Sequence, residues 1–267
     1  MTIILVLLIM TAPLFGAFDY TIPDVILMST SESMVVSKHH YAAYLLNPAV
    51  SSQVRDAHLS LHYTQPYGIT GLISGAFISQ LKRGDYGFGL TATAFGNELY
   101  RENQLIGNLS HEFFDGQLAV GVNLRWNNLA VENYGTINVL GVDAGVQYQI
   151  QGGLLMGFAI RNINQPQLNN HAEELPVITQ WGISFQPIER FDTYIALIKE
   201  SWYPLSVRIG VLMRINSILG IHSGFNSNPS VPSFGFTLKR NWISVQYGLQ
   251  YHFDLGGTHV WGLSIER

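Results

Sequence analysis

Residues 243–253 read Ile-Ser-Val-Gln-Tyr-Gly-Leu-Gln-Tyr-His-Phe, and apolar or aromatic residues alternate in them with small or polar ones. Because a strand turns successive side chains to opposite faces, this stretch is predicted to be a β-strand with one apolar face and one polar face. A run of about ten residues with an aromatic-rich apolar face is what a tilted strand needs to cross a bilayer.

The composition of the whole chain agrees with this prediction. The chain has 267 residues, of which 47% are hydrophobic and only 12% are charged. Soluble proteins carry about 25% charged residues, so the surface of this protein differs from the water-exposed surface of an ordinary soluble protein. After the first 18 residues no segment is long and apolar enough for a spanning helix. Two readings remain, a transmembrane β-barrel and a soluble all-β protein with a large buried interior.

Alternating segments separated by turn signals continue along the chain from about residue 57. They predict about fourteen strands, an even number that suits a bacterial single-chain barrel with both ends on the periplasmic side. The expected strands are 57–65, 69–81, 86–96, 103–113, 117–130, 136–150, 153–164, 176–186, 190–199, 204–214, 217–226, 231–239, 242–253 and 258–266. The predicted fold is therefore all-β, a transmembrane antiparallel up-and-down β-barrel.

Two regularities favour the membrane barrel over the soluble one. Charged residues gather at the segment ends, as at Lys82-Arg83 and Lys239-Arg240, and a bilayer drives charges out of the apolar band in this way. Short turns, as at Gly84 and Asn241, also alternate with longer connections near 97–102, 131–135, 165–175 and 227–230. This alternation is typical of short periplasmic turns and longer external loops.

The amino-terminal part of the chain does not follow the strand pattern. Residues 3–10 form a short apolar core, so residues 1–17 are predicted to be a signal peptide, with an amino-terminal anchor or a misassigned start as the alternatives. Residues 18–54 are expected to form a hatch-like segment inside the periplasmic end of the barrel, and residues 55–267 the barrel itself.

The sequence contains no catalytic motif of a common hydrolase or metalloenzyme. Ser110, His111 and Glu112 are adjacent, and adjacent residues on a strand point to opposite faces, so they do not form a triad. The histidines show no metal-ligand spacing beyond the pair His39-His40. From the missing motifs we expect no enzyme, no metal and no cofactor. The chain has no cysteine for thiolate chemistry, and its formal charge of −4 leads us to expect no nucleic-acid partner.

Polar residues in the middle of strands are the candidate functional residues. A charge that faces lipid near the midplane costs about 2–4 kcal/mol, so these side chains are expected to point into the lumen. They are Arg125, Asp143, Arg161, Arg208 and His252. Two interpretations stay open: the residues line or gate a permeation path, or they form ion pairs that fill the interior.

The sequence resembles the FadL-type outer-membrane family, and within it the PorV/PorQ-like proteins. The resemblance rests on the strand number and on two short motifs, which are Asn47-Pro48-Ala49 ahead of the first strand and Leu255-Gly256 with Thr258-His259 in the closing hairpin. It implies a fourteen-stranded barrel with an amino-terminal hatch. Members of the family either pass hydrophobic compounds across the outer membrane or serve as accessory subunits of the type IX secretion apparatus.

The sequence thus leads to one main functional hypothesis and two alternatives. The main hypothesis is an outer-membrane barrel of PorV/PorQ type that is accessory to secretion or has a role of its own. The alternatives are a FadL-like transporter of hydrophobic compounds and a soluble periplasmic lipid-binding β-barrel whose apolar faces turn inward. The expected partners are outer-membrane lipid, other envelope or secretion-system proteins, and hydrophobic small molecules.

Overall fold

The computed structural model describes residues 17–18, 24–54, 57–151, 153–168, 174–201 and 203–266. Nearly all of the predicted signal peptide lies outside these residues. No helix in the described part of the chain is both long enough and apolar enough to cross a membrane.

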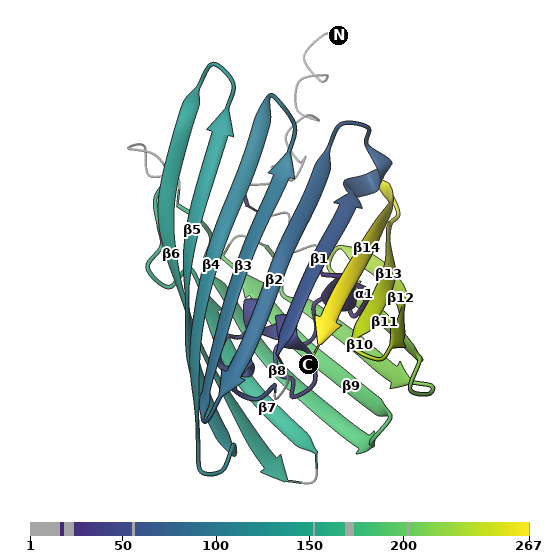
Figure 1. Ribbon diagram of the computed structural model, residues 1–267. Helices are drawn as coiled ribbons and strands as arrows, with labels where there is room; N and C mark the ends of the chain where they lie inside the picture. The colour runs from purple at the N-terminus through teal and green to yellow at the C-terminus, as the bar shows by residue number, and fades with distance from the viewer. Residues whose placement is uncertain are drawn as a thin grey trace, which may run out of the picture.

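Fourteen antiparallel strands form one closed barrel, in which each strand pairs with its neighbours in sequence and β1 pairs with β14 (Figure 1). The strands are β1 (His58–Gln65), β2 (Ile73–Arg83), β3 (Tyr86–Gly96), β4 (Tyr100–Phe113), β5 (Leu118–Val131), β6 (Gly135–Gln151), β7 (Leu154–Arg161), β8 (Ile178–Ile188), β9 (Phe191–Glu200), β10 (Ser206–Arg214), β11 (Leu219–Ser227), β12 (Ser230–Arg240), β13 (Ile243–His252) and β14 (Gly256–Glu266). The predicted fold class and strand number are confirmed.

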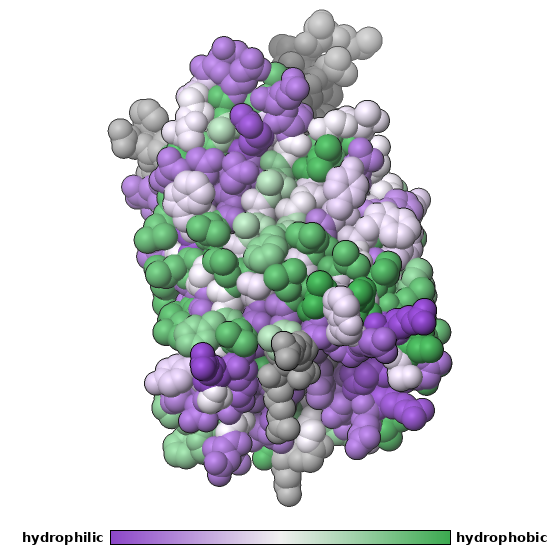
Figure 2. Space-filling view, in the orientation of Figure 1, coloured by the Kyte–Doolittle hydropathy of each residue, from purple (hydrophilic) through white to green (hydrophobic). Residues whose placement is uncertain are grey.

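The predicted apolar faces point outward, away from the lumen. Leu124, Trp181 and Val245, for example, are 54%, 44% and 47% exposed, while their sequence neighbours point inward. Figure 2 shows the resulting band of hydrophobic residues between two hydrophilic ends. A soluble lipid-binding barrel needs these faces inside, so that alternative is wrong.

The two ends of the barrel differ in their connections. We call the end with the β2–β3, β4–β5 and β12–β13 turns and the carboxyl end of β14 the turn end, and the opposite end the loop end (Figure 1). The predicted alternation of connection lengths is only partly correct. The connections 97–99, 132–134 and 228–229 are as short as the turns, and the connections that are longer are 66–72, 162–177 and 201–205.

The segment 24–54, which we call the hatch, lies inside the barrel. It contains one short helix and two 3-10 helices, α1 (Val25–Ser29), η1 (Tyr41–Leu45) and η2 (Pro48–Ser52). A further 3-10 turn, η3 (Pro66–Gly68), belongs to the β1–β2 connection. Hatch residues such as Leu27, Met34 and Tyr44 are fully buried and form a core with inward wall residues such as Ile78 and Ile106.

Glycines on the inner wall make room for the hatch. A Cβ added at Gly121 would lie 2.3 Å from the Pro48 carbonyl oxygen, and one at Gly87 would lie 2.2 Å from the Ser51 carbonyl carbon. The same close approach occurs at Gly89, Gly145, Gly157, Gly182, Gly210, Gly224, Gly235 and Gly248. The glycines on the polar faces of the strands are therefore the surface on which the hatch packs, with its backbone at Gly87 and Gly121 and with side chains at positions such as Gly182.

We predict that Gly121→Val displaces the hatch, whereas Gly107→Val on the neighbouring strand does not. A side chain at Gly121 collides with backbone atoms, while a Cβ at Gly107 points outward with no atom within 4 Å. Overpacking of this kind destabilises by about 1–3 kcal/mol. Proteolysis of the hatch in detergent-solubilised barrels measures the effect, and equal cleavage of the two variants would contradict the prediction.

Candidate functional site in the polar lumen

The carboxyl end of η1 is held by side chains of the barrel wall. Arg125 and Arg161 both donate to the Leu45 carbonyl oxygen, at 2.8 Å and 3.2 Å. Asn123 donates to the Tyr44 carbonyl oxygen at 3.0 Å, and Gln180 donates to that of Leu46 at 3.1 Å. The last carbonyls of a helix have no partner within the helix, so the wall supplies the missing donors.

Inward-facing Asn and Gln side chains of the wall form hydrogen bonds with the backbone of the rest of the hatch. Gln80 donates to the carbonyl oxygens of Ser51 and Val54 at 2.8 Å and 3.0 Å, and Asn108 donates to that of Pro48 at 2.9 Å. Gln147 accepts from the Ser37 backbone N–H and donates to the Ser37 carbonyl oxygen. The buried, irregular backbone of the hatch is thereby hydrogen-bonded without regular secondary structure.

The predicted lumen residues all lie on the inner face, and the structure pairs two of the three arginines. Arg125 forms a buried ion pair with Asp143, and Arg208 pairs with Glu32 of the hatch. Arg161 has no carboxylate within ion-pair distance among the described residues, and its buried Nε has no hydrogen-bond partner. His252 is partly exposed near the loop end of β13.

Arg125, Arg161 and Arg208 border one cavity, of about 110 Å³, on the side of the hatch that faces the loop end. Its polar wall also includes Glu32 and Glu200. Its apolar wall contains Phe18, Leu175, Pro176, Ile178 and Ile198. His252 borders a separate cavity of about 130 Å³, which shares Glu32 and Arg208 with the first. The candidate site is therefore an amphipathic cavity that the hatch closes from below.

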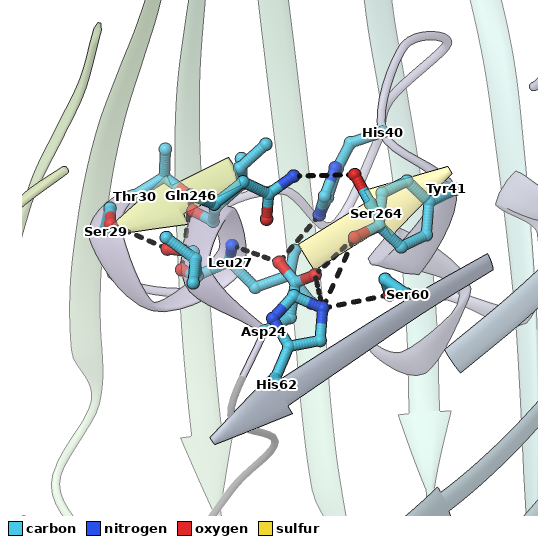
Figure 3. A network of polar contacts seen from close by, with 12 residues as sticks. Asp24, Leu27, Ser29, Thr30, His40, Tyr41, Ser60, His62, Gln246 and Ser264 are labelled. Atoms are coloured by element: carbon cyan, nitrogen blue, oxygen red, sulfur yellow. Dashed lines mark hydrogen bonds and ion pairs between the residues drawn. The ribbon is translucent and has the colours of Figure 1, made fainter. Parts of the chain in front are cut away.

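A buried cluster around Asp24 fixes the first helix of the hatch to the barrel (Figure 3). The Asp24 carboxylate accepts from the Leu27 backbone N–H at 2.8 Å, which caps α1, and from the Tyr41 hydroxyl at 3.2 Å. It lies 2.9 Å from Nε2 of His40 and 3.2 Å from Nε2 of His62 on β1. The cluster thus joins α1, the start of η1 and the barrel wall.

The pKa of Asp24 reflects this surrounding. Burial alone would raise the pKa, but the two histidines and the hydrogen bonds from His40 and Leu27 hold it well below its usual value. The ionised carboxylate therefore stabilises the docked hatch at neutral pH.

Asp24, His62 and Ser60 are the residue types of a hydrolase triad, but their geometry is wrong for one. Nε2 of His62 lies 2.9 Å from Ser60 Oγ and also faces Asp24, while Nδ1 has no partner. A triad needs one ring nitrogen for the nucleophile and the other for the carboxylate. His111 and Glu112 point to opposite faces, as predicted. No group of metal-ligating side chains suited to an ion occurs among the described residues.

The two motifs behind the family resemblance occupy defined structural positions. Asn47 caps η2 by accepting from the Ala49 N–H at 3.1 Å, it donates to the Val146 carbonyl oxygen, and Pro48 begins the helix. In the closing hairpin, Leu255 lies in the turn and Gly256 has a positive φ of 92°. Thr258 accepts from the Tyr67 N–H at 3.0 Å, and Nδ1 of His259 shares a hydrogen bond of 2.8 Å with the Tyr247 hydroxyl on the outer face.

Some residues that hold the site escaped sequence reasoning. Asp24, Glu32 and the inward amides Gln80, Asn108 and Gln147 all make their key contacts across more than 15 positions of sequence. The available signal was the recurrence of Asn and Gln on the polar faces of strands. That recurrence indicates an interior rich in hydrogen bonds, but it does not identify the partners.

Comparisons with known proteins support the fold. No protein-family model and no curated protein sequence matches the chain. Among solved structures, the CymD monoaromatic hydrocarbon channel has a TM-score of 0.64 at 13% identity, with 91% of this chain and 96% of that one covered. The toluene transporter TodX of P. putida has a TM-score of 0.59 at 13% identity, with coverage of 84% and 92%. A FadL homologue of Pseudomonas aeruginosa has a TM-score of 0.60 at 10% identity, with coverage of 91% and 95%.

These likenesses define a class of protein by its fold. The chain has the architecture of the FadL-type barrels, which is the coarser part of the resemblance noted in the sequence. Nothing in the comparisons distinguishes a PorV/PorQ-like protein within that architecture.

We predict that docking of the hatch weakens in acid because of Asp24. A carboxyl group with a depressed pKa stabilises the folded state above its unfolded pKa of about 3.9, and this stabilisation is lost as the pH falls further. Hydrogen exchange of residues 24–30, corrected for intrinsic rates, should therefore rise in the wild type as the pH falls below about 4.

In Asp24→Asn the exchange should already be fast at neutral pH, and the rise below about pH 4 should be absent. Asp115→Asn, in an exposed turn, is the matched control and should behave like the wild type. Parallel pH profiles for the wild type and Asp24→Asn would show that this carboxylate does not hold the hatch.

We also predict that Arg125→Met destabilises the barrel much more than Arg161→Met. The first substitution leaves the buried Asp143 carboxylate without its cation, which costs about 3–5 kcal/mol. The second removes one hydrogen bond of a charged group, of about 1.5–3 kcal/mol, but it also removes a buried cation that has no carboxylate partner among the described residues, which offsets part of the loss. Urea unfolding in detergent micelles measures the difference, and similar losses for both variants would refute the anchoring role of the Arg125–Asp143 pair.

Proposed function

We propose that this protein is an outer-membrane channel of FadL type that admits small hydrophobic compounds to the cavity above the hatch. The observation that carries the proposal is the cavity itself, which has an apolar wall of Leu175, Pro176, Ile178 and Ile198 and lies inside a transmembrane barrel. Apolar residues on inward faces favour a hydrophobic transporter over a polar pore. The names of the similar structures, a monoaromatic hydrocarbon channel and a toluene transporter, support the same class of compound.

The loop end faces the outside in this proposal, and the hatch closes the periplasmic side. This orientation follows the rule that both ends of a bacterial barrel lie in the periplasm. It also agrees with the predicted signal peptide. Of the two functions that the family resemblance implies, the transporter has this cavity in its favour, whereas no contact of the described residues bears on a secretion role.

The position of the hatch in the lumen also determines what a compound needs in order to cross the barrel. The hatch packs on wall glycines and is hydrogen-bonded around the barrel, so a compound in the cavity cannot move on past a docked hatch. The Arg208–Glu32 pair lies where the hatch meets the cavity. We therefore propose that the cavity is a resting site and that local movement of the hatch releases the compound.

A filled cavity should block uptake. Ile198→Trp places a large ring into the cavity from a buried position on β9, and we expect uptake of toluene by cells that produce this variant to fall at least fivefold. Ile195→Trp is the matched control, because Ile195 lies on the same strand and points to lipid. Uptake is measured with radiolabelled toluene against cells without the barrel.

Both variants must first be recovered in the outer membrane with heat-modifiable mobility on gels. Toluene uptake that is equal for the wild type, Ile198→Trp and cells without the barrel would refute the transport function. Uptake that requires the barrel but is unchanged in Ile198→Trp would show that the compound crosses by a route other than this cavity.

A further inference from the structure

Strand β6 rises beyond its neighbour β7 at the loop end. β6 pairs with β5 along Gly135–Tyr148, but its pairing with β7 begins only at Ala144, opposite Ile160. β8 starts at Ile178, level with the last residue of β7, so it does not extend the wall either. In the described part of the chain, the residues Gly135–Asp143 therefore have a strand on one side only, and the β5–β6 hairpin stands above this gap (Figure 1).

The first residues after β7 cover the lower part of this edge. The Ile163 N–H donates to the Val142 carbonyl oxygen at 2.9 Å. The Asn164 side chain accepts from the Val142 N–H and donates to the Leu140 carbonyl oxygen, both at 2.8 Å. The carboxamide of Asn164 thus satisfies one N–H and one C=O of β6 that a further paired strand would otherwise satisfy. This edge is already used as a site for an amide.

Above Asn164 the edge is unpaired. Because Val142 directs its N–H and C=O to the β7 side, the period of two directs those of Asn138 and Thr136 to the same side. Within the described part of the chain, the backbone N–H and C=O groups of these two residues have no hydrogen-bond partner on that side, and the Asn138 side chain accepts from Asn128 of β5. Their side chains and that of Tyr134 are exposed to solvent.

The free edge also lacks the usual protection. Natural edge strands carry charged residues, proline or bulges that prevent another strand from pairing. Gly135–Leu140 reads Gly-Thr-Ile-Asn-Val-Leu, with no charge and no proline, and its register with β5 has no bulge. Thr136, Ile137 and Val139 are β-branched residues that favour strands. The edge is therefore both accessible and suited to strand pairing.

We propose that the Gly135–Leu140 edge of β6 binds an extended peptide segment of another protein, which adds to the sheet as a strand antiparallel to β6. Main-chain hydrogen bonds to Asn138 and Thr136 supply the affinity in this mode of recognition. The added strand continues the line of β7, beyond the position that Asn164 occupies. The proposal does not depend on which compound the lumen takes.

The same geometry excludes a second copy of the chain as the occupant. In one membrane the β6 strands of two barrels run in the same direction, so they cannot pair as antiparallel strands. A twofold axis along the membrane normal would also set N–H groups opposite N–H groups. The partner is thus a different chain whose segment is free to run toward the loop end.

The side chains beside the edge define the pattern of that segment. Ile137 and Val139 are half-buried on the inner face, while Thr136 and Asn138 are exposed on the outer face. Cross-strand neighbours on one face stabilise a sheet when they match in character. The segment should therefore alternate apolar residues, which face inward, with polar residues, which face outward.

Selection from a library of nine-residue peptides on the detergent-solubilised full-length barrel tests the proposal. We expect the selected peptides to show the alternating pattern and to bind at least tenfold more weakly to Asn138→Pro, which lacks one edge N–H. Asn138→Thr keeps that N–H and should bind like the wild type. Binding is measured by the fluorescence anisotropy of labelled peptides.

Two further measurements keep the test independent of how the proline variant folds. Thr136→Pro removes the second edge N–H, and peptides with N-methyl groups on alternate residues remove the matching donors from the ligand while the barrel stays wild type. We expect both changes to weaken binding about tenfold. The proposal is overturned if selection yields no binder, or if the selected peptides bind equally well after N-methylation.

Discussion

The hydrogen-bonding demand of an irregular backbone buried inside a closed barrel governs most of this structure. The hatch has few residues in regular helices, and its carbonyls and N–H groups cannot reach bulk water. An unpaired backbone group in such a place costs about 1–3 kcal/mol. The inner wall meets this demand with the side chains of Gln80, Asn108, Asn123, Gln147 and Gln180, and glycines between them let the backbones approach.

This demand also explains the charges of the lumen. Arg125 forms an ion pair with Asp143 and also donates to the Leu45 carbonyl oxygen. Arg208 forms an ion pair with Glu32, which has a left-handed backbone conformation like its neighbour Ser31. Left-handed backbone costs about 1–2 kcal/mol per residue without glycine, and the ion pair offsets part of that cost. The interpretation that lumen charges fill the interior as ion pairs therefore describes Arg125 and Arg208 better than it describes Arg161. Arg161 and Arg208 each combine a place on the cavity wall with an Nε that has no hydrogen-bond partner, and of the two only Arg161 also lacks a carboxylate partner among the described residues.

Sequence reasoning predicted the barrel well because a membrane imposes its rule one residue at a time. Each of Val120, Val122 and Leu124 must face lipid, so the period of two remains visible along every strand. The site is different, because its contacts depend on register around the whole barrel. Asp24 meets His62, and Glu32 meets Arg208, only after closure of the barrel has set the distance between strands. No local pattern contains that information, which is why the polar faces were predicted and their partners were not.

Every backbone polar group needs a hydrogen-bond partner, and this rule governs both the barrel wall, which faces lipid, and its rim, which faces water. Within the lipid band every backbone group must be paired inside the protein, so each strand there has two neighbours and the barrel is closed. Above the band water can satisfy an edge, so β6 can continue after β7 has ended. Asn164 lies where the pairing with β7 has ended, beside the exposed apolar residues Leu140 and Ile163, and its carboxamide takes the place of the missing strand. The free edge of β6 therefore starts where the membrane no longer forces the barrel to be closed.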